Sequence, residues 1–267
     1  MDATLEQEIE KPPPWMYAWE LGDGVTTPLV GPELSEIHQT RLELMRAPVQ
    51  AALSSAGPDA TVIDLACNEG WFSHRMLDWG ASRVLGVDIR PRLIRRAELL
   101  RAHFGISADR LELRCCDVFD LDASELGTYD VVLCLGLIYH LENPVGAMRI
   151  ARAVTRGVCI IETQLTRQTE AIIHGNGRSD QYEKSPASFA ALLETDQEGN
   201  MLAAAGGVVS LIPNRAALLQ AARAAGFAET EVAPTSECHN RQYVLGDRAV
   251  LLAWPTASAA AARAAYP

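Results

Sequence analysis

Short apolar runs alternate with amphipathic stretches between residues 61 and 162, and this alternation predicts strands separated by helices. The apolar runs predict strands at 61–66, 83–89, 111–118, 129–139 and 158–162. The stretches of helical periodicity predict helices at 71–79, at 91–104 and from 144 to a point before Gly157. Strands joined by helices in this way form right-handed βαβ units, so the pattern predicts a mostly parallel sheet with helices on both faces.

The segment before this region has a different pattern. Residues 11–31 are rich in proline and glycine, so we expect an irregular segment there. Aromatic residues interleave with its prolines and glycines and indicate that the segment packs over another part of the protein; they are Trp15, Tyr17 and Trp19. A helix is expected from Pro32 to about Leu53, interrupted at Pro48.

After the fifth predicted strand, residues 165–213 show no regular periodicity and are expected to be irregular. A helix is predicted to begin at an Asn214 cap and to end at Gly226. Two further strands are predicted at 229–233 and 242–254, the latter as a hairpin or a bulged strand around Gly246. The chain is therefore expected to form one α/β domain with a doubly wound, Rossmann-like sheet of about seven strands.

Composition and charge narrow the class of protein. The chain has 267 residues, 48% of them hydrophobic, which is typical of a globular protein, and its net charge of −11 disfavours tight binding to nucleic acid or to an anionic membrane. The longest uncharged apolar run, residues 131–139, is about half as long as a membrane-spanning helix. Neither a signal peptide nor a metal-binding or disulfide pattern of cysteines is present, so we expect a cytoplasmic protein without a metal site.

The candidate chemistry lies where the predicted strands end. In parallel sheets, ligands bind beyond the carboxyl ends of the strands. The first strand ends with Asp64 and leads into a turn with small residues at Ala66 and Gly70. The second has Asp88 at its end, where a ribose diol would be bound, and the third has Asp117 at its end, where it could accept from an adenine amino group. The three acids suit a ligand with a ribose, an adenine and an amino-bearing or cationic tail.

The same turn disfavours a nicotinamide dinucleotide. A dinucleotide fingerprint would require glycines at the positions that Ala66, Asn68 and Trp71 occupy. The bulk of Trp71 would obstruct the close packing of helix on strand that the third glycine permits. A nicotinamide-dependent oxidoreductase is therefore a remote alternative.

With these residues in place, the sequence resembles the class I S-adenosylmethionine-dependent methyltransferases from about residue 61 to residue 162. Their first motif is matched in a variant form by Asp64, Ala66, Asn68 and Gly70, with Ala66 and Asn68 in place of the usual first two glycines. Within the class, the stretch Leu137-Ile138-Tyr139-His140-Leu141 followed by Asn143-Pro144 resembles bacterial small-molecule methyltransferases. It is also similar to the tRNA wobble-uridine carboxymethyl-transferring enzymes.

The resemblance implies S-adenosylmethionine as cofactor. It puts Asp64 and Gly70 near the methionine moiety, Asp88 at the ribose, and Asp117 with Val118 at the adenine. The other residues that we assign to the cofactor site are Ala66, Asn68, Ile89 and Leu135.

His140 is the principal candidate for catalysis, because the family places residues that face the methyl group after the fourth strand. Its near-neutral pKa suits a general base that takes a proton from a hydroxyl or an amine. The competing interpretation is a structural histidine bonded to a loop carbonyl. Tyr139 is a second, weaker candidate, for which packing is the competing role. Glu162, at the end of the fifth predicted strand, either orients a substrate or caps a loop.

Three functions follow as hypotheses. The first is methyl transfer to an oxygen, nitrogen or carbon of a small organic acceptor, which the acidic charge favours. The second is an RNA methyltransferase, or a carboxymethyltransferase that acts on tRNA. The third is a non-catalytic regulatory protein that retains the cofactor, since two motif glycines are replaced.

The expected parts of the domain are an N-terminal lid and helix (1–55), a cofactor-binding core (56–164), a substrate-capping insertion (165–213), a C-terminal helix with the last strands (214–255) and a tail (256–267).

Overall fold

A computed structural model describes residues 3–12, 14–174, 182–194, 209–236 and 238–261 of the protein. Its main sheet has seven strands in the order β10-β11-β5-β4-β1-β2-β3, and β11 runs antiparallel to the other six. The prediction of a mostly parallel sheet of about seven strands is confirmed. The strands are β1 (Thr61–Leu65), β2 (Arg83–Asp88), β3 (Leu111–Cys115), β4 (Tyr129–Leu135), β5 (Thr155–Gln164), β10 (Glu229–Val232) and β11 (Arg248–Trp254).

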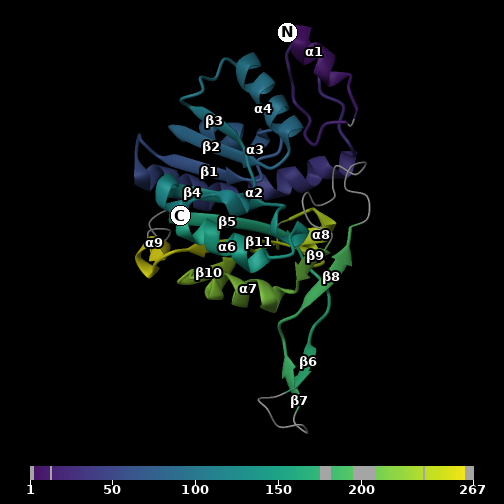
Figure 1. Ribbon diagram of the computed structural model, residues 1–267, viewed down its shortest axis with the longest axis vertical. Coiled ribbons are helices and arrows are strands. Elements are labelled where there is room, and N and C mark those ends of the chain that lie inside the picture. Colours follow the sequence, from purple (N-terminus) through teal and green to yellow (C-terminus); the bar gives the residue numbers. More distant parts are fainter. Residues whose placement is uncertain (1–2, 13, 175–181, 195–208, 237, 262–267) are drawn as a thin grey trace.

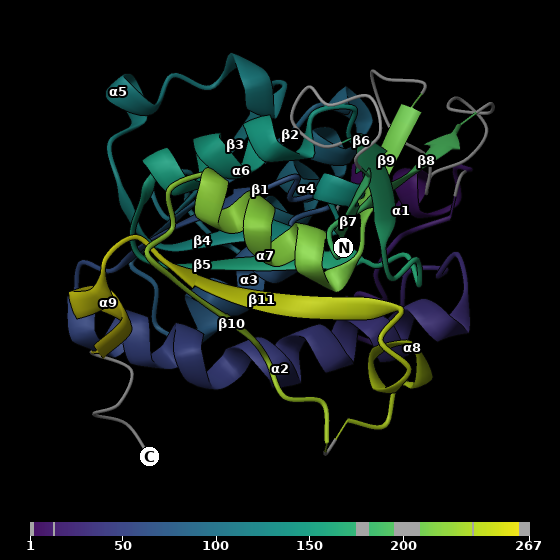
Figure 2. The same ribbon diagram turned by 90° about the horizontal axis from the view of Figure 1, so that it is seen from below.

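Helices cover both faces of this sheet, as predicted. One core contains the apolar faces of α2 (Pro32–Ala56), α3 (Trp71–Asp78) and α4 (Pro91–His103), whereas the other contains those of α6 (Pro144–Ala153) and α7 (Arg215–Ala224). Figure 2 shows α2 and α7 on opposite sides of β11. The sheet lies between two apolar layers, so the carboxyl ends of its parallel strands are the open side.

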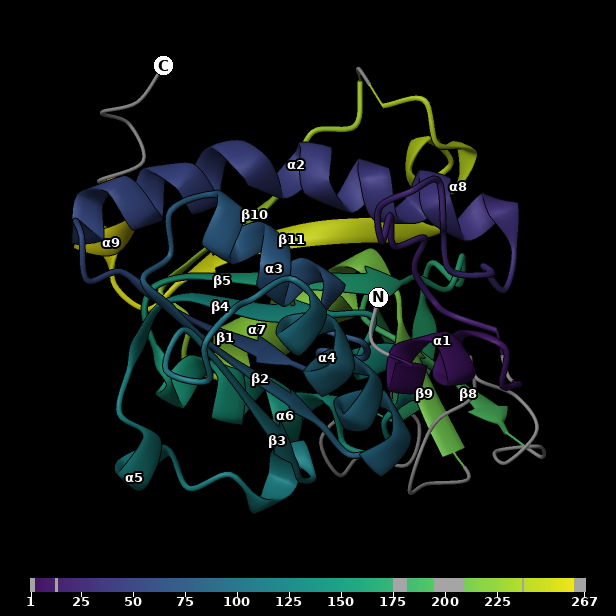
Figure 3. The same ribbon diagram turned by 90° about the horizontal axis from the view of Figure 1, so that it is seen from above.

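Helix α1 (Ala3–Ile9) lies beside α4 (Figure 3). The other short elements are α5 (Ala123–Leu126), α8 (Arg241–Val244), α9 (Ala257–Ala261) and the 3₁₀ turns η1 (Val118–Asp120) and η2 (Ile138–His140). Two separate hairpins pair β6 (Ala171–His174) with β7 (Tyr182–Ser185) and β8 (Phe189–Leu193) with β9 (Val209–Pro213). The prediction of an irregular segment at 165–213 is therefore wrong. Figure 1 shows β6 and β7 extending away from the main body.

Several boundaries also differ from the predictions, and in three places the chain turns or begins another element inside a predicted strand. The fourth strand ends at Leu135 because Gly136 has a φ of +69°, so Tyr139 and His140 lie in η2. The predicted strand at 242–254 is instead the short helix α8, a turn at Gly246 with a φ of +75°, and β11. The third strand stops at Cys115, and Val118 begins η1.

Pro48 does not interrupt the long helix α2, contrary to the prediction. Proline removes only its own N–H from the helical ladder, so the loss is confined to one turn. The buried side chains of Met45 and Val49 keep the turns on both sides of it against the sheet. Tertiary packing therefore outweighs the local preference.

The N-terminal segment packs over the domain, as its aromatic residues predict. Trp15, Tyr17 and Trp19 are all buried in the core that also contains α2 and α3. The ring of Tyr17 stacks on that of Trp71 at the start of α3, with 5.4 Å between ring centroids and 2° between planes. This contact holds the segment across the open side of the sheet.

Candidate functional site

A cavity of about 450 Å³ lies at the carboxyl ends of β1, β2 and β4. Its wall includes residues of the N-terminal segment, of α2 and of β11 as well as the loops that follow the parallel strands. All but two of the predicted site residues line the cavity, and the two exceptions are Asp64 and Gly70. The lining residues are Ala66, Asn68, Asp88, Ile89, Asp117, Val118, Leu135, Tyr139 and His140. The topology therefore brings together residues that are far apart in the sequence.

The loop after β1 has an unusual backbone. Ala66, Asn68 and Gly70 have φ values of +64°, +53° and +80°, so two non-glycine residues adopt the left-handed region. Asparagine tolerates this region, but alanine is strained there. The loop is held by hydrogen bonds from the Cys67 N–H to the Val87 carbonyl (2.8 Å) and from the Gly70 N–H to the Cys67 carbonyl (2.9 Å). Alanine and asparagine therefore adopt here the left-handed backbone that glycine would adopt without strain.

Asp88 joins this loop to the end of β2. Its two carboxylate oxygens accept hydrogen bonds from the backbone N–H groups of Asn68 and Arg90, each at 2.9 Å. Burial raises the pKa of Asp88, and these two hydrogen bonds oppose that shift. A carboxylate has about four acceptor positions, so each oxygen retains the capacity to accept one more donor from the cavity.

Asp64 and Gly70 lie behind the wall. Asp64 is buried and accepts a hydrogen bond of 2.7 Å from the Ser73 hydroxyl, which fixes α3 against β1. Burial raises the pKa of Asp64 to about 7, although the bond from Ser73 lowers it. Gly70 is the N-cap of α3, and a Cβ atom built on it would lie 3.4 Å from the Cβ atom of Ala97. Both residues support the loop from beneath.

Another part of the wall is made by the segment after β3. The Asp117 carboxylate accepts a hydrogen bond of 2.9 Å from the Phe119 N–H and thereby caps η1. Val118 is buried and Ile89 is exposed, and both present apolar surface to the cavity. This part combines an acceptor with apolar walls.

His140 lies in η2, after β4, and also lines the cavity. Its Nδ1 atom is 3.3 Å from Glu194 Oε1, and its ring is 4.2 Å from that of Tyr139 between centroids. Burial lowers the pKa of His140, while the hydrogen bond and charge of Glu194 oppose the shift. The imidazole is therefore largely neutral near pH 7, which is the form that accepts a proton.

Buried charges line the side formed by α2 and β11. The carboxylate of Glu162 lies 2.7 Å from Arg41 Nη2 and 2.9 Å from Arg248 Nη1, and accepts a hydrogen bond of 2.9 Å from the Tyr243 hydroxyl. Burial alone would raise the pKa of Glu162, but the two guanidinium groups hold it below its usual value. Both arginines line the cavity, whereas Glu162 does not. The cluster therefore presents net positive charge to a ligand.

Arg41 and Arg248 were not among the predicted site residues. Arg41 is four residues from both Ile37 and Met45, so it lies on the buried stripe of α2. An arginine on an otherwise apolar stripe requires an anionic partner, and that pattern is the signal in the sequence. Arg248 begins a buried apolar strand and carries the same signal.

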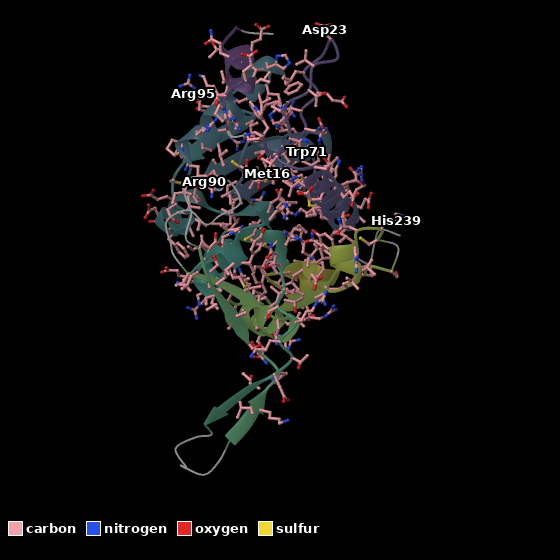
Figure 4. All side chains as sticks on the ribbon, turned by 90° about the vertical axis from the view of Figure 1, so that its right-hand side faces the viewer. Met16, Asp23, Trp71, Arg90, Arg95 and His239 are labelled. Atoms are coloured by element: carbon pink, nitrogen blue, oxygen red, sulfur yellow. The ribbon has the colours of Figure 1, made fainter. Side chains whose placement is uncertain are left out.

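The N-terminal segment reaches the cavity through Glu69. The carboxylate of Glu69 accepts hydrogen bonds from the backbone N–H groups of Met16 (3.1 Å) and Tyr17 (3.4 Å). Met16 and Tyr17 line the cavity. Figure 4 labels Met16 and Trp71 near each other in the main body of the protein. The segment is thus tied to the same loop that forms the floor of the site.

Two features are absent from the part of the chain that the structure describes. There, no group of three or more histidine, cysteine, aspartate or glutamate side chains is arranged to hold a metal ion. Within the same residues, no helix has the length and apolar character needed to cross a membrane.

Comparison with known proteins adds a family to this geometry. Residues 56–206 match the family described as methyltransferase domain. A ubiquinone biosynthesis O-methyltransferase from Xanthomonas axonopodis pv. citri is 29% identical over 151 residues, which are 57% of this chain and 57% of that protein. The chain thus aligns with little more than half the length of this curated relative.

Solved structures resemble the whole fold. The N-terminal domain of EvdMO1, crystallised in the presence of SAH and D-fucose, has a TM-score of 0.67 at 23% identity, covering 95% of this chain and 97% of that chain. A magnesium protoporphyrin IX methyltransferase from Synechocystis PCC 6803, crystallised with bound SAM, has a TM-score of 0.53 at 16% identity, covering 87% and 86%. At these identities the likeness establishes the fold.

Proposed function

Because this chain belongs to the class I S-adenosylmethionine-dependent methyltransferases, we propose that it transfers a methyl group to a hydroxyl of a small organic acceptor. The observation that carries the proposal is the single cavity whose wall contains Asp88, Asp117 and His140. The names of the related O-methyltransferases support oxygen as the nucleophile. The net charge of −11 supports a small molecule over a polynucleotide.

The residues of the cavity fit the proposed cofactor. The free acceptor positions of Asp88 suit the two ribose hydroxyls, and Asp117 suits the amino group of adenine between the apolar surfaces of Ile89 and Val118. A volume of about 450 Å³ lies within the range of small-molecule sites. Arg41 and Arg248 line the same cavity and share the one carboxylate of Glu162, so their remaining positive charge suits the carboxylate of the cofactor.

When bound, S-adenosylmethionine supplies a methyl group that its positive sulfur makes electrophilic. The tasks of this chain are then to orient the acceptor, exclude water and remove a proton. Met16 and Tyr17, held by Glu69, exclude water from one side of the cavity. His140, neutral near pH 7, takes the proton of the acceptor hydroxyl. Tyr139 packs beside it and limits the orientations of its ring.

Two measurements test this proposal. Titration calorimetry with S-adenosylhomocysteine should give saturable binding to the wild type and at least tenfold weaker binding to Asp88→Asn, because a neutral amide replaces one acceptor by a donor. Transfer of label from methyl-labelled S-adenosylmethionine would then be measured across phenolic acceptors and deoxysugars such as D-fucose. Absence of binding to S-adenosylhomocysteine would contradict the function. Binding without transfer to any acceptor would favour the regulatory alternative.

The buried arginines favour a second candidate, transfer of a carboxymethyl group from a carboxylated form of the cofactor. Arg41 and Arg248 share one carboxylate, that of Glu162, so an additional carboxylate in the cavity would balance the remaining charge. Binding of S-adenosylmethionine and of its carboxylated analogue should be compared in the wild type and in Arg248→Met. Tighter binding of the analogue that Arg248→Met abolishes would support this candidate, and equal affinities would exclude it.

A further inference from the structure

The second hairpin brings a carboxylate to the back of the proposed catalytic histidine. The Leu211 N–H of β9 donates to the Leu141 carbonyl at 3.1 Å, and the Val209 N–H donates to Glu142 Oε1 at 3.3 Å. These contacts attach the β8–β9 pair to the loop after η2. As a result, Glu194, which directly follows β8, lies against His140.

His140 and Glu194 form a hydrogen-bonded pair with a defined orientation. Glu194 Oε1 lies 3.3 Å from His140 Nδ1 and accepts a hydrogen bond of 2.6 Å from the buried hydroxyl of Ser210. The Glu194 side chain is 10% exposed and does not line the cavity, whereas His140 does. No hydrogen bond to His140 Nε2 is present among the described residues. The carboxylate therefore occupies one ring nitrogen and leaves the other for a ligand.

We propose that Glu194 is a positioning residue that keeps the proton of neutral His140 on Nδ1, so that Nε2 accepts the proton of the acceptor hydroxyl. The inference rests on the proposed function and adds a second residue to its proton transfer. A ring nitrogen that donates to a fixed carboxylate is locked in tautomer and orientation, which is what a general base requires. Ser210 fixes the carboxylate in turn.

The proton and electron balance is complete without another reactant. As the acceptor oxygen forms its bond to the methyl carbon, its proton moves to His140 Nε2. The bond between that carbon and sulfur breaks, and its electron pair remains on sulfur as a thioether. The imidazolium then donates from Nδ1 to the ionised carboxylate of Glu194, which stabilises its charge without taking the proton.

The positive charges near His140 shift its pKa in the direction opposite to Glu194. Burial lowers the pKa of His140, and so do the positive charges of Arg90 and Arg248, while Glu194 raises it. Removal of the Glu194 charge should therefore lower the pKa of His140 further. A contact that only attaches the hairpin to η2 would let this pKa fall without a loss of kcat.

The test is an imidazole nitrogen NMR titration of the full chain bound to S-adenosylhomocysteine. The chain has six histidines, and His140→Gln assigns the signal by its loss. We expect the Nδ1–H tautomer in the wild type and a pKa lower by about 0.5 to 1 pH unit in Glu194→Gln. The matched control is Glu170→Gln, which removes an exposed carboxylate paired with Lys184 in the same insertion and should leave His140 unchanged.

Two results would overturn the inference. One is an Nε2–H tautomer of His140 in the wild type, which requires no variant. The other is an unchanged pKa and tautomer in Glu194→Gln that retains the wild-type unfolding profile. With an acceptor from the label-transfer panel, Glu194→Gln should lower kcat about 10- to 100-fold, leave KM for S-adenosylmethionine unchanged and move the acid limb of the rate profile to lower pH. Failure of the wild type to bind S-adenosylhomocysteine would instead contradict the proposed function.

Discussion

Glu69 and Arg96 form an ion pair from which solvent is excluded: Arg96 Nη1 lies 2.9 Å from Glu69 Oε1, and both side chains are 0% exposed. Arg96 also contacts Glu8 at 3.3 Å and lies over the ring of Trp15, 4.2 Å from its centroid. Since Glu69 binds the backbone of Met16, this pair connects α4, the loop after β1 and the N-terminal segment. The position of the segment over the cavity depends on it.

Breaking this pair should destabilise the fold strongly. Arg96→Ala leaves the Glu69 carboxylate buried without its cationic partner, and we expect the free energy of unfolding to fall by about 3 kcal/mol or more. The exposed neighbour Arg95, at the periphery in Figure 4, provides the control, because Arg95→Ala should change it by no more than about 0.5 kcal/mol. Urea denaturation measures both. Equal losses in the two variants would refute the role of the pair.

The pH dependence of stability should change in Asp64→Asn. Burial raises the pKa of Asp64 from 3.8 to about 7, so between these values the unfolded chain ionises this group while the folded chain retains its proton. The resulting loss of stability is absent below about pH 4, grows as the pH rises and is complete above about pH 7. The asparagine has no such ionisation and still accepts from Ser73.

We therefore expect Asp64→Asn to gain stability relative to the wild type by on the order of 2 kcal/mol or more between about pH 4 and pH 8. Unfolding at a series of pH values measures the difference. Asp78→Asn, in an exposed pair with Arg75, should show a nearly constant difference from the wild type. A constant difference for Asp64→Asn as well would contradict an elevated pKa.

The strained turn after β1 gives a second prediction of increased stability. Ala66 has a φ of +64°, a conformation that costs alanine about 1 to 2 kcal/mol and glycine almost nothing. After the larger unfolded-state entropy of glycine is subtracted, Ala66→Gly should raise the free energy of unfolding by about 0.5 to 1 kcal/mol. Ala102→Gly, at an exposed position of α4, should lower it by about 1 kcal/mol. A loss at both positions would show that the turn is not strained.

The sequence alone predicts the parts of the fold that depend on local pattern. Strands β1, β2 and β4 are buried apolar runs, and their carboxyl ends meet in any parallel sheet, so Asp88 and Asn68 were predictable as neighbours. The turn of η2 was not, because the apolar run continues past Leu135 while the backbone turns at Gly136. The hydrophobic pattern of the sequence therefore does not predict where the backbone turns.

The charged pairs were beyond local pattern for a different reason. Arg41, Glu162 and Arg248 come from α2, β5 and β11, and nothing in the sequence around each one identifies its partner. Glu194 is a similar case, since the β8–β9 hairpin that carries it has no clear alternation of polar and apolar residues. Burial of an arginine on an apolar stripe indicates that a partner exists, but the tertiary fold decides which residue it is.

Glu162→Gln tests how far the protein depends on that shared partner. The substitution leaves Arg41 and Arg248 buried without a carboxylate between them, so we expect the free energy of unfolding to fall by about 3 kcal/mol at low ionic strength. The two charges then repel each other, and a small anion that enters the cavity relieves the repulsion. Added chloride or acetate should therefore stabilise this variant more than the wild type, and S-adenosylhomocysteine, which carries a carboxylate, should do so at lower concentration.

Thermal unfolding against anion concentration measures this stabilisation. Glu112→Gln is the control, because its pair with Arg114 is exposed. A variant that is destabilised but insensitive to anions would show that the arginines are closed to ligands, and the carboxylate role proposed for Arg41 would then be wrong.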